Sequence, residues 1–151
     1  MKKLLGMLML ALVVTGCSGG GEKTTTVCKG NIDELTTNTT TIEATDDKVS
    51  TMKATIEYDV TSLVSDTTTI EYLESYVKSM NVDYGSLDGV TAKYTTEGTI
   101  ITLEVEINYE EADMEQLADA GVITSTDGKE IAYISLDETI KEQEAAGLTC
   151  K

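Results

Sequence analysis

The residues of this chain best placed for chemistry are its three cysteines, Cys17, Cys28 and Cys150. Cys17 stands directly after Val14–Gly16, a run of small residues at the end of an apolar segment. This is the pattern of a bacterial lipobox, in which a peptidase cuts before the cysteine and the thiol carries a diacylglycerol. The pattern predicts signal cleavage between Gly16 and Cys17, and lipidation of Cys17.

The segment before Cys17 has the layout of a secretory signal peptide. Two lysines, Lys2 and Lys3, precede an apolar run from Leu4 to Val14, and this basic-then-apolar order is typical of export signals. A membrane-spanning helix needs about 20 apolar residues, roughly twice the length of this run. We therefore expect residues 1–16 to be a signal peptide. The alternative, a buried helix with a free thiol at its end, fits neither the charge order nor the glycines that follow.

The chain after the cut is expected to contain a tether and one domain. Residues 17–26 have a Gly/Ser/Thr bias, so we interpret them as the lipidated N-terminus and a flexible tether. Residues 27–151 suit a single folded domain. Removal of Lys2 and Lys3 changes the formal net charge from −16 to −16 − 2 = −18. Anionic headgroups should repel such a domain, so the expected membrane contact is the lipid anchor, on the extracytoplasmic face of the cell membrane.

The other two cysteines lie near opposite ends of the domain. An exported chain with two remaining thiols, Cys28 and Cys150, favours a disulfide that closes a loop of 150 − 28 = 122 residues. A pair of reduced structural thiols remains the alternative. Two cysteines without histidine do not complete a tetrahedral zinc site. A redox-active pair would normally be close in sequence, so no metal and no thiol catalysis are predicted.

The composition argues against several classes of function. The chain has no His, Trp, Phe, Pro or Arg, and so lacks the commonest general base, the commonest zinc ligand and the bidentate anion clamp. Its negative charge argues against binding of nucleic acid, which requires cations to displace counterions. We therefore predict a protein that is not an enzyme and has no cofactor.

Period-two patterns predict most of the domain to be strands. Apolar and polar residues alternate from Met52 to Val60 and from Ile101 to Tyr109. A hairpin partner is expected at Thr39–Ala44, before a polar turn at Asp46–Lys48. Weaker strand signals occupy residues 27–32, 90–94 and 131–134, and residues 148–151 are expected to extend toward Cys28.

Three helices are predicted between these strands. Ile70, Leu73, Val77 and Met80 form an amphipathic stripe, with Thr68 and Glu71 as a capping box at its start. A short helix runs from the N-cap Asp113 to Gly121, and another is capped by Ser135 with Glu138 and stops at Gly147. This order predicts an α+β fold, a single domain whose antiparallel β-sheet has helices packed on one face.

Several phrases of the chain resemble one known family. After the lipobox come, in order, the segments 27–31 (VCKGN), 55–59 (TIEYD), 88–90 (DGV), 133–136 (YISL) and 147–151 (GLTCK). Together they resemble the YehR-like bacterial lipoproteins, a family of small domains of unknown function. The resemblance implies an α+β envelope lipoprotein with no established activity. It supplies no catalytic residues and adds little to the disulfide.

Carboxylates are the remaining candidates for a site. Glu104 and Glu106 lie on one strand face, about 7 Å apart at the backbone, a spacing comparable to glycosidase pairs, but a solvated strand face gives the same pattern. Possible oxygen ligands for a cation occur in three clusters, Asp46 with Asp47, Glu110 and Glu111 with Asp113, and Glu142 with Glu144. None of them has the spacing of a calcium-binding loop.

Contact surfaces are the other candidates. Two interpretations of the stripe from Ile70 to Met80 remain open. It forms a groove for a partner helix or, more simply, it is the face that packs on the sheet. Tyr72, Tyr76 and Tyr84 are a candidate contact patch. We therefore expect a lipid-anchored, non-enzymatic interaction or structural module of the cell envelope, with an envelope protein as its possible partner. The alternative is a lipoprotein that binds a cation or a small cationic ligand.

Overall fold

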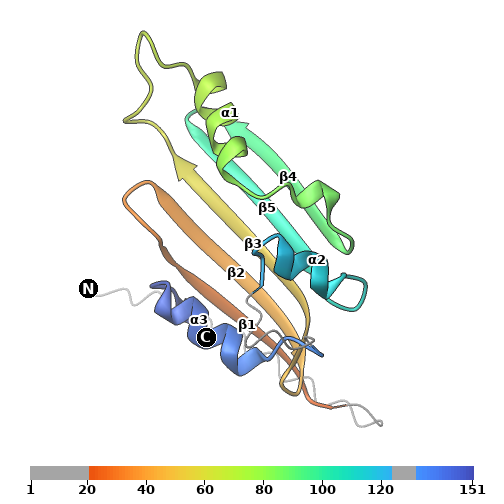
Figure 1. Cartoon of the computed structure of the whole chain (residues 1–151). Helices are drawn as coiled ribbons and strands as arrows, with labels where there is room; N and C mark the ends of the chain where they lie inside the picture. Colours follow the sequence, from red (N-terminus) through yellow and green to blue (C-terminus); the bar gives the residue numbers. More distant parts are fainter. Residues whose placement is uncertain (1–20, 124–131) are drawn as a thin grey trace, which may run out of the picture.

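The computed structural model describes residues 21–123 and 132–151 (Figure 1). The expected signal peptide and the sites Gly16 and Cys17 lie outside the described residues. Six strands form one antiparallel sheet in the order β4-β5-β3-β2-β1-β6. Their bounds are β1 Lys23–Asn31, β2 Thr36–Thr45, β3 Lys48–Asp59, β4 Val90–Glu97, β5 Ile100–Asn108 and β6 Thr149–Cys150.

In the described residues three α-helices accompany the sheet, α1 Ile70–Met80, α2 Met114–Asp119 and α3 Leu136–Ala145, with a 3-10 turn η1 at Tyr84–Ser86. The expected single domain of mixed α and β structure, built on an antiparallel sheet, is therefore confirmed at this level. Within the two described ranges, no helix is long and apolar enough to cross a bilayer.

The alternation read from the sequence sets the register of the sheet. On β5 the side chains of Ile101, Leu103, Val105 and Ile107 are buried, whereas Thr102, Glu104 and Glu106 between them reach solvent. Val105 lies opposite Ala54 of β3. Ala54 in turn lies opposite Thr40 of β2, and Thr40 opposite Cys28 of β1. Apolar and small residues thus share rows across the sheet, because neighbouring strands in register point their paired side chains to the same side.

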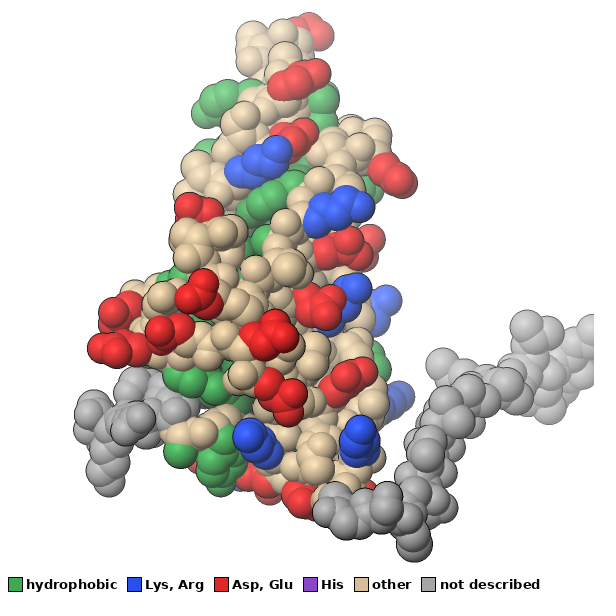
Figure 2. All heavy atoms as spheres, turned by 90° about the vertical axis from the view of Figure 1, so that its right-hand side faces the viewer, with side chains coloured by type: hydrophobic (Ala, Val, Ile, Leu, Met, Phe, Trp, Pro, Cys, Tyr) green, Lys and Arg blue, Asp and Glu red, His purple; other side chains and the backbone are tan. Residues whose placement is uncertain are grey.

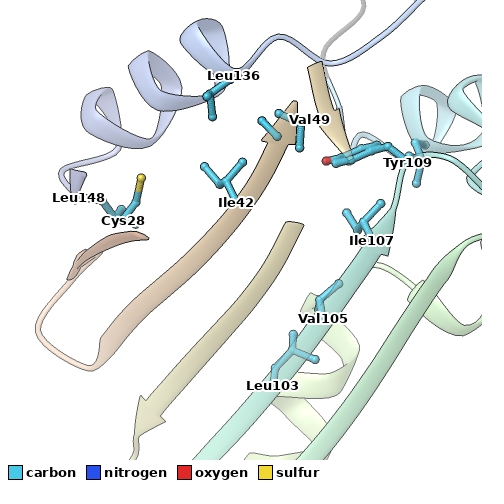
Figure 3. Packing of buried hydrophobic residues seen from close by; sticks show 11 residues of the cluster. Cys28, Ile42, Val49, Leu103, Val105, Ile107, Tyr109, Leu136 and Leu148 are labelled. Carbon is cyan, nitrogen blue, oxygen red and sulfur yellow. The ribbon is translucent and has the colours of Figure 1, made fainter. Parts of the chain in front are cut away.

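The buried side chains form two clusters. The larger cluster joins Ile42 and Ile107 of the sheet to Leu117 of α2 and Leu136 of α3 (Figure 3). It also contains Cys28, Val49, Tyr109 and Leu148. The smaller cluster consists of Val60, Leu73, Val77 and Ile101, and it fixes α1 at the end of the sheet where β3 stops. Each helix is therefore held by one or two buried aliphatic side chains, of which Leu117 of α2 is fully buried.

Two of the three predicted helix starts are correct and one is displaced. Asp113 caps α2 through Glu115 and Gln116, and Ser135 caps α3 by accepting from the amide of Glu138. The cap of α1 is Thr69, not Thr68. The reason is that Thr68 and Ser65 exchange two backbone hydrogen bonds, of 3.0 and 3.2 Å. Thr68 is thereby held in the preceding turn, and the hydroxyl oxygen of Thr69 accepts the hydrogen bond from the amide of Tyr72 in the first turn of the helix.

Three other expectations need correction. Strand β1 begins at Lys23, so residues 23–26, expected in the tether, pair with β2; their β-branched threonines suit a strand. Residues 132–134 are not a strand, and Ile131 lies outside the described residues. Ile134 instead accepts one hydrogen bond from the amide of Val49, at 2.9 Å. Met80 is 56% exposed and does not belong to the buried stripe of α1.

Candidate functional site

Cys28 and Cys150 lie opposite each other on adjacent antiparallel strands, β1 and β6. Their Sγ atoms are 2.00 Å apart, so the pair is compatible with a disulfide. Cys28 is fully buried. Beside the pair, Val27 and Lys151 exchange backbone hydrogen bonds of 2.9 and 3.0 Å. The cysteine pair therefore stands where the end of the chain joins the sheet, in the core, and not in an open cleft.

The aspartates of the first acidic cluster, Asp46 and Asp47, accept hydrogen bonds from backbone amides. Asp46, in a left-handed turn conformation with φ 53°, accepts a hydrogen bond from the amide of Glu22 at 3.0 Å. Asp47 accepts from the amide of Asp137 and the hydroxyl of Ser135, each at 3.0 Å. These two bonds hold the pKa of Asp47 below its usual value. Asp47 thereby ties the β2–β3 turn to the start of α3.

The remaining acids of those clusters do not converge on a metal site. Glu110, Glu111, Glu142 and Glu144 are exposed, and Asp113 is engaged as the cap of α2. Across residues 21–123 and 132–151, no three side chains of the metal-binding types are grouped so that they could hold an ion.

A shallow depression of about 260 Å³ lies beside the β1–β2 hairpin. Four carboxylates line it, those of Asp33, Glu34, Glu57 and Asp59, together with Asn31, Leu35, Thr37 and Ile100. The amide of Leu35 lowers the pKa of Asp33, and hydrogen bonds from Thr61 lower that of Asp59. Both carboxylates are therefore ionised at neutral pH. The sequence did not reveal this site, because the fold, and no local motif, brings the hairpin beside the end of β3.

The carboxylates considered for hydrolysis lie on the polar side of β5. Glu106 pairs with Lys53 of β3 at 3.9 Å between Oε2 and Nζ, and both side chains are about half exposed. A surface pair of this kind contributes about 0 to 1 kcal/mol. Neither Glu104 nor Glu106 lines the depression described above. The structure thus places Glu104 and Glu106 on a solvated strand face, which was the alternative to a catalytic pair in the interpretation of their spacing.

The tyrosines expected to form one contact patch are separated by the fold. Tyr72 and Tyr76 are 65% and 52% exposed on α1. Tyr84 is half-buried and packs against the larger cluster. Burial raises the pKa of its hydroxyl. Met80, at 56% exposed, takes the third place beside Tyr72 and Tyr76.

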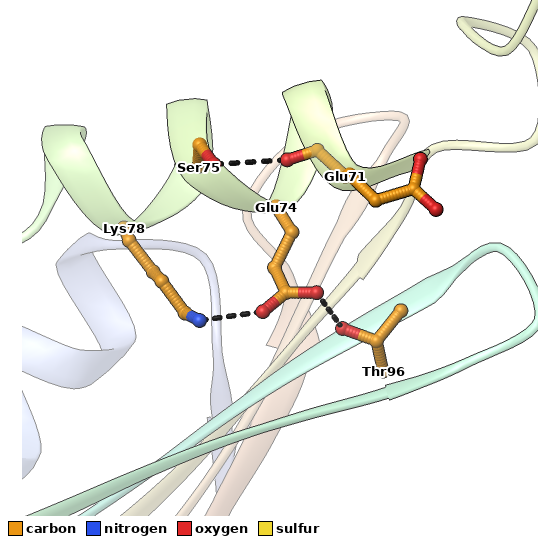
Figure 4. A network of polar contacts seen from close by, with 5 residues as sticks. All are labelled: Glu71, Glu74, Ser75, Lys78 and Thr96. Atoms are coloured by element: carbon orange, nitrogen blue, oxygen red, sulfur yellow. Dashed lines mark hydrogen bonds and ion pairs between the residues drawn. The ribbon is translucent and has the colours of Figure 1, made fainter. Parts of the chain in front are cut away.

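A polar network fastens the other side of α1 to β4 (Figure 4). Glu74 accepts a hydrogen bond from the hydroxyl of Thr96 at 3.0 Å and forms an ion pair with Lys78. These contacts, that with Lys78 first, lower the pKa of Glu74. The ammonium group of Lys78 lies 5.5 Å from the ring centroid of Tyr94, within the range of a cation–π contact.

Charged side chains are spread over the side of the molecule seen in Figure 2, where acidic groups outnumber lysines and apolar side chains show between them. Because the signs are interspersed, this view shows no continuous basic surface of the kind that binds a phosphate backbone.

Comparisons with known proteins bear on family and fold. A family model described as "Protein of unknown function (DUF1307)" matches residues 25–149. The NMR structure of the YehR protein of E. coli is similar, with a TM-score of 0.68 and 20% sequence identity over 87% of this chain and 93% of that one. An NMR structure of a protein from Streptococcus pneumoniae TIGR4 has a TM-score of 0.56 and 15% identity over 100% and 98%. Curated proteins gave no match. At these identities the two structures support the fold alone.

Proposed function

The chain belongs to the DUF1307 family of proteins of unknown function, and we propose that it is an extracytoplasmic lipoprotein that acts as a non-enzymatic module of the cell envelope. In this proposal Cys17 carries the lipid and the domain presents a surface to another envelope component. The expected likeness to YehR agrees with the family match and the similar fold. The role itself is inferred from the residues of this chain.

The observation that carries the proposal is the lipobox at Cys17, which lies only a few residues before the first strand. Cys17 ends a basic-then-apolar segment, and β1 begins at Lys23. Six residue steps span at most about 20 Å when fully extended. A lipid on Cys17 would therefore keep the sheet close to the bilayer. Because the domain is strongly acidic, the lipid and not the protein surface would provide the attachment.

Anchoring is tested by substitution of the lipidated thiol in the full-length chain. Cys17→Ser should release the protein from membranes washed with alkaline carbonate, or leave it as an unprocessed precursor. Ser18→Ala, one residue away, keeps the thiol and should remain bound. Mature Cys17→Ser protein that stays with the washed membranes as completely as Ser18→Ala would contradict the proposal.

We also infer that all three helices cover the same face of the sheet. The sheet residues in both clusters, such as Ile42 and Ile101, belong to the rows of small and apolar residues that share one face. Leu73, Leu117 and Leu136 join these clusters from α1, α2 and α3. The opposite face, with Thr55 and Glu104 in one row, would then be open to solvent.

Thiol labelling tests this arrangement of the helices. A cysteine placed at Thr55 or Glu104 should react with a maleimide reagent as fast as a free thiol in the native protein. A cysteine at Val105, which is only 5% exposed, should react only after unfolding. Protection of both Thr55 and Glu104 in the isolated domain would mean that the second face is covered.

A second candidate function is the binding of a small cationic ligand in the depression beside the β1–β2 hairpin. The four carboxylates that line it favour a cation, since like charges gathered in a hollow raise the local concentration of counterions. A thermal-shift series with spermidine, Ca²⁺ and Mg²⁺ tests it, because a specific site gives saturable stabilisation. Asp33→Asn with Glu57→Gln should abolish the saturation, whereas Glu110→Gln with Glu111→Gln, a matched exposed pair, should preserve it. Equal unsaturating shifts in all three proteins would leave only ionic screening.

A further inference from the structure

Helix α3 and strand β6 follow each other along the edge of the sheet beside β1 (Figure 1). The helix is fixed at its beginning. Its two buried residues, Leu136 and Thr139, belong to the first turn. Ser135 caps this turn, and Asp47 of the β2–β3 turn accepts a hydrogen bond from it. Residues 140–147 are exposed or only partly buried, so the second half of the segment depends on what holds its far end.

The far end is held by one buried side chain and by the cysteine pair (Figure 3). Leu148, which is 5% exposed, packs with Cys28 in the larger cluster. Strand β6, which comes next, has two residues and pairs with β1 only at Cys28 and Lys29. A strand of this length adds little stability by itself. Cys28 is fully buried, whereas Cys150 is partly exposed. The fold thus fixes Cys28, and the crosslink to Cys28 fixes Cys150.

We propose that the Cys28–Cys150 pair is a redox-sensitive switch, and that its reduction allows residues 140–151, here named the α3–β6 flap, to separate from β1. The switch depends on the crosslink and not on the proposed lipid anchor. The first turn of α3 would remain in place and act as the hinge. The flap lies directly on the backbone of β1, since a Cβ added at Gly30 would be 2.8 Å from the carbonyl oxygen of Gly147. Its separation would therefore expose the outer edge of β1 and the side chain of Cys28.

The reductant of the switch is a dithiol, and the reaction exchanges one disulfide for another. A thiolate of the dithiol attacks Sγ of Cys150, the more exposed cysteine. A mixed disulfide forms, the bond between the two Sγ atoms breaks, and Cys28 leaves as a thiolate that takes up a proton. The second thiol of the reductant then attacks the mixed disulfide, and Cys150 leaves as a thiolate that is protonated in turn. Two electrons and two protons thus pass to the cysteine pair, and the reductant leaves as a disulfide.

The weak support of β6 keeps the change local. After reduction, the two thiols meet at an effective concentration that is set by the chain joining them. Backbone hydrogen bonds, such as the two between Val27 and Lys151, then hold β6, and each contributes little net stability because water can replace it. Strand β1, in contrast, keeps nine residue pairs with β2. Reduction should therefore open the α3–β6 flap without unfolding the sheet.

Alkylation of Cys28 in the reduced full-length chain tests the switch. The chain is reduced with dithiothreitol, separated from it and treated with a maleimide, and the modified residues are identified by peptide mass spectrometry. The control is Val105→Cys in the Cys28→Ala, Cys150→Ala background, because Val105 is only 5% exposed and belongs to the same cluster but lies on β5. Cys28 should react at least about tenfold faster than this control, since local opening needs less free energy than unfolding. Reoxidation before the maleimide is added should again protect Cys28.

Each of three results would overturn the switch. Alkylation of Cys28 as slow as that of the control, in protein whose cysteine pair is reduced, would mean that the flap stays closed without the crosslink. Equally fast alkylation at both positions would mean that the opening extends beyond the flap and that the crosslink supports the whole sheet. An intact mass that the reductant leaves unchanged would mean that no crosslink exists. The test of the lipid anchor with Cys17→Ser is independent of all three.

Discussion

Removal of the crosslink between Cys28 and Cys150 should destabilise the domain strongly. The perturbation is the double variant Cys28→Ala and Cys150→Ala, which leaves no unpaired thiol in the core. The two residues are 122 positions apart, and a crosslink over about 120 residues restricts the unfolded chain by about 5 kcal/mol in the chain-entropy model. Measured effects are usually smaller, so we expect a loss of about 3 to 5 kcal/mol.

Urea unfolding followed by circular dichroism measures this loss. With a slope of about 1 to 3 kcal/mol per molar urea for a small protein, the midpoint should fall by about 1 to 3 M. The loss should begin at β6, whose register with β1 covers only Cys28 and Lys29. Hydrogen exchange at the amides of Val27 and Lys151, which bond each other across the two strands, should therefore accelerate before the rest of the sheet does.

Two results would refute this reasoning. Intact masses of the wild-type domain that are identical with and without reductant would show that the thiols are not crosslinked. Equal free energies of unfolding for the double variant and the oxidised wild type would show that the crosslink does not restrict the unfolded chain. Cys150→Ser alone is a poorer test, because it leaves the buried thiol of Cys28 without its partner.

Three further predictions follow from single contacts. Leu117→Ala removes a fully buried side chain from the larger cluster and should lower the free energy of unfolding by about 2 to 5 kcal/mol in urea. Gly89 and Gly98 both have positive φ, but a Cβ at Gly89 would lie 2.5 Å from the backbone nitrogen of Ala112, whereas a Cβ at Gly98 would meet no atom within 4 Å. Gly98→Ala should lower the free energy of unfolding by about 1 to 3 kcal/mol through backbone strain, and Gly89→Ala should lower it further. Equal decreases in the two variants would exclude the contact with Ala112 as the cause. Burial raises the pKa of Tyr109 to about 12, above its value in the unfolded chain, so stability should be complete below about pH 10 and fall as the pH rises toward 12; Tyr109→Phe should remove this part of the fall.

Strand β5 was predictable because buried apolar side chains alternate along it with side chains that reach solvent. The alternation from Ile101 to Tyr109 agrees with β5, Ile100–Asn108, to within one residue at each end, and the five apolar residues of that alternation are buried. Strand β1 was harder to predict, because its threonine-rich start is compatible both with a flexible tether and with a strand. What decides the structure there is the pairing of Lys23–Thr26 with β2, a partner about 20 residues away, which no local window contains.

The helices were located correctly, but their exposed faces were not. Spacing alone grouped Met80 with Leu73 and Val77, since three- and four-residue steps both suit an amphipathic stripe. The structure separates Met80 from that set: it is 56% exposed, and it is not among the side chains that pack in the smaller cluster with Val60 and Ile101 of the sheet end.

The acidic residues illustrate the same limit for the candidate sites. Asp46 and Asp47 are adjacent in sequence and suggested a cation site, yet they bond Glu22 and Ser135 on opposite sides of the turn. Asp33 and Asp59 are 26 positions apart and line one depression. Adjacent acids in a turn diverge to satisfy local amides, whereas a depression collects acids from strand ends that only the sheet topology brings together.

In the proposed arrangement, β1 is the element through which the membrane would act on the domain. The tether enters β1 at Lys23, nine residue pairs hold β1 to β2, and the cysteine pair joins it to β6. A pull on the lipid would therefore be shared by the sheet before it could reach α1, which depends on the small cluster around Leu73. This division suits a module that is fixed at one end and makes contacts at the other. Loss of the crosslink should therefore weaken the anchored end of the sheet before it affects the packing of α1 on the smaller cluster.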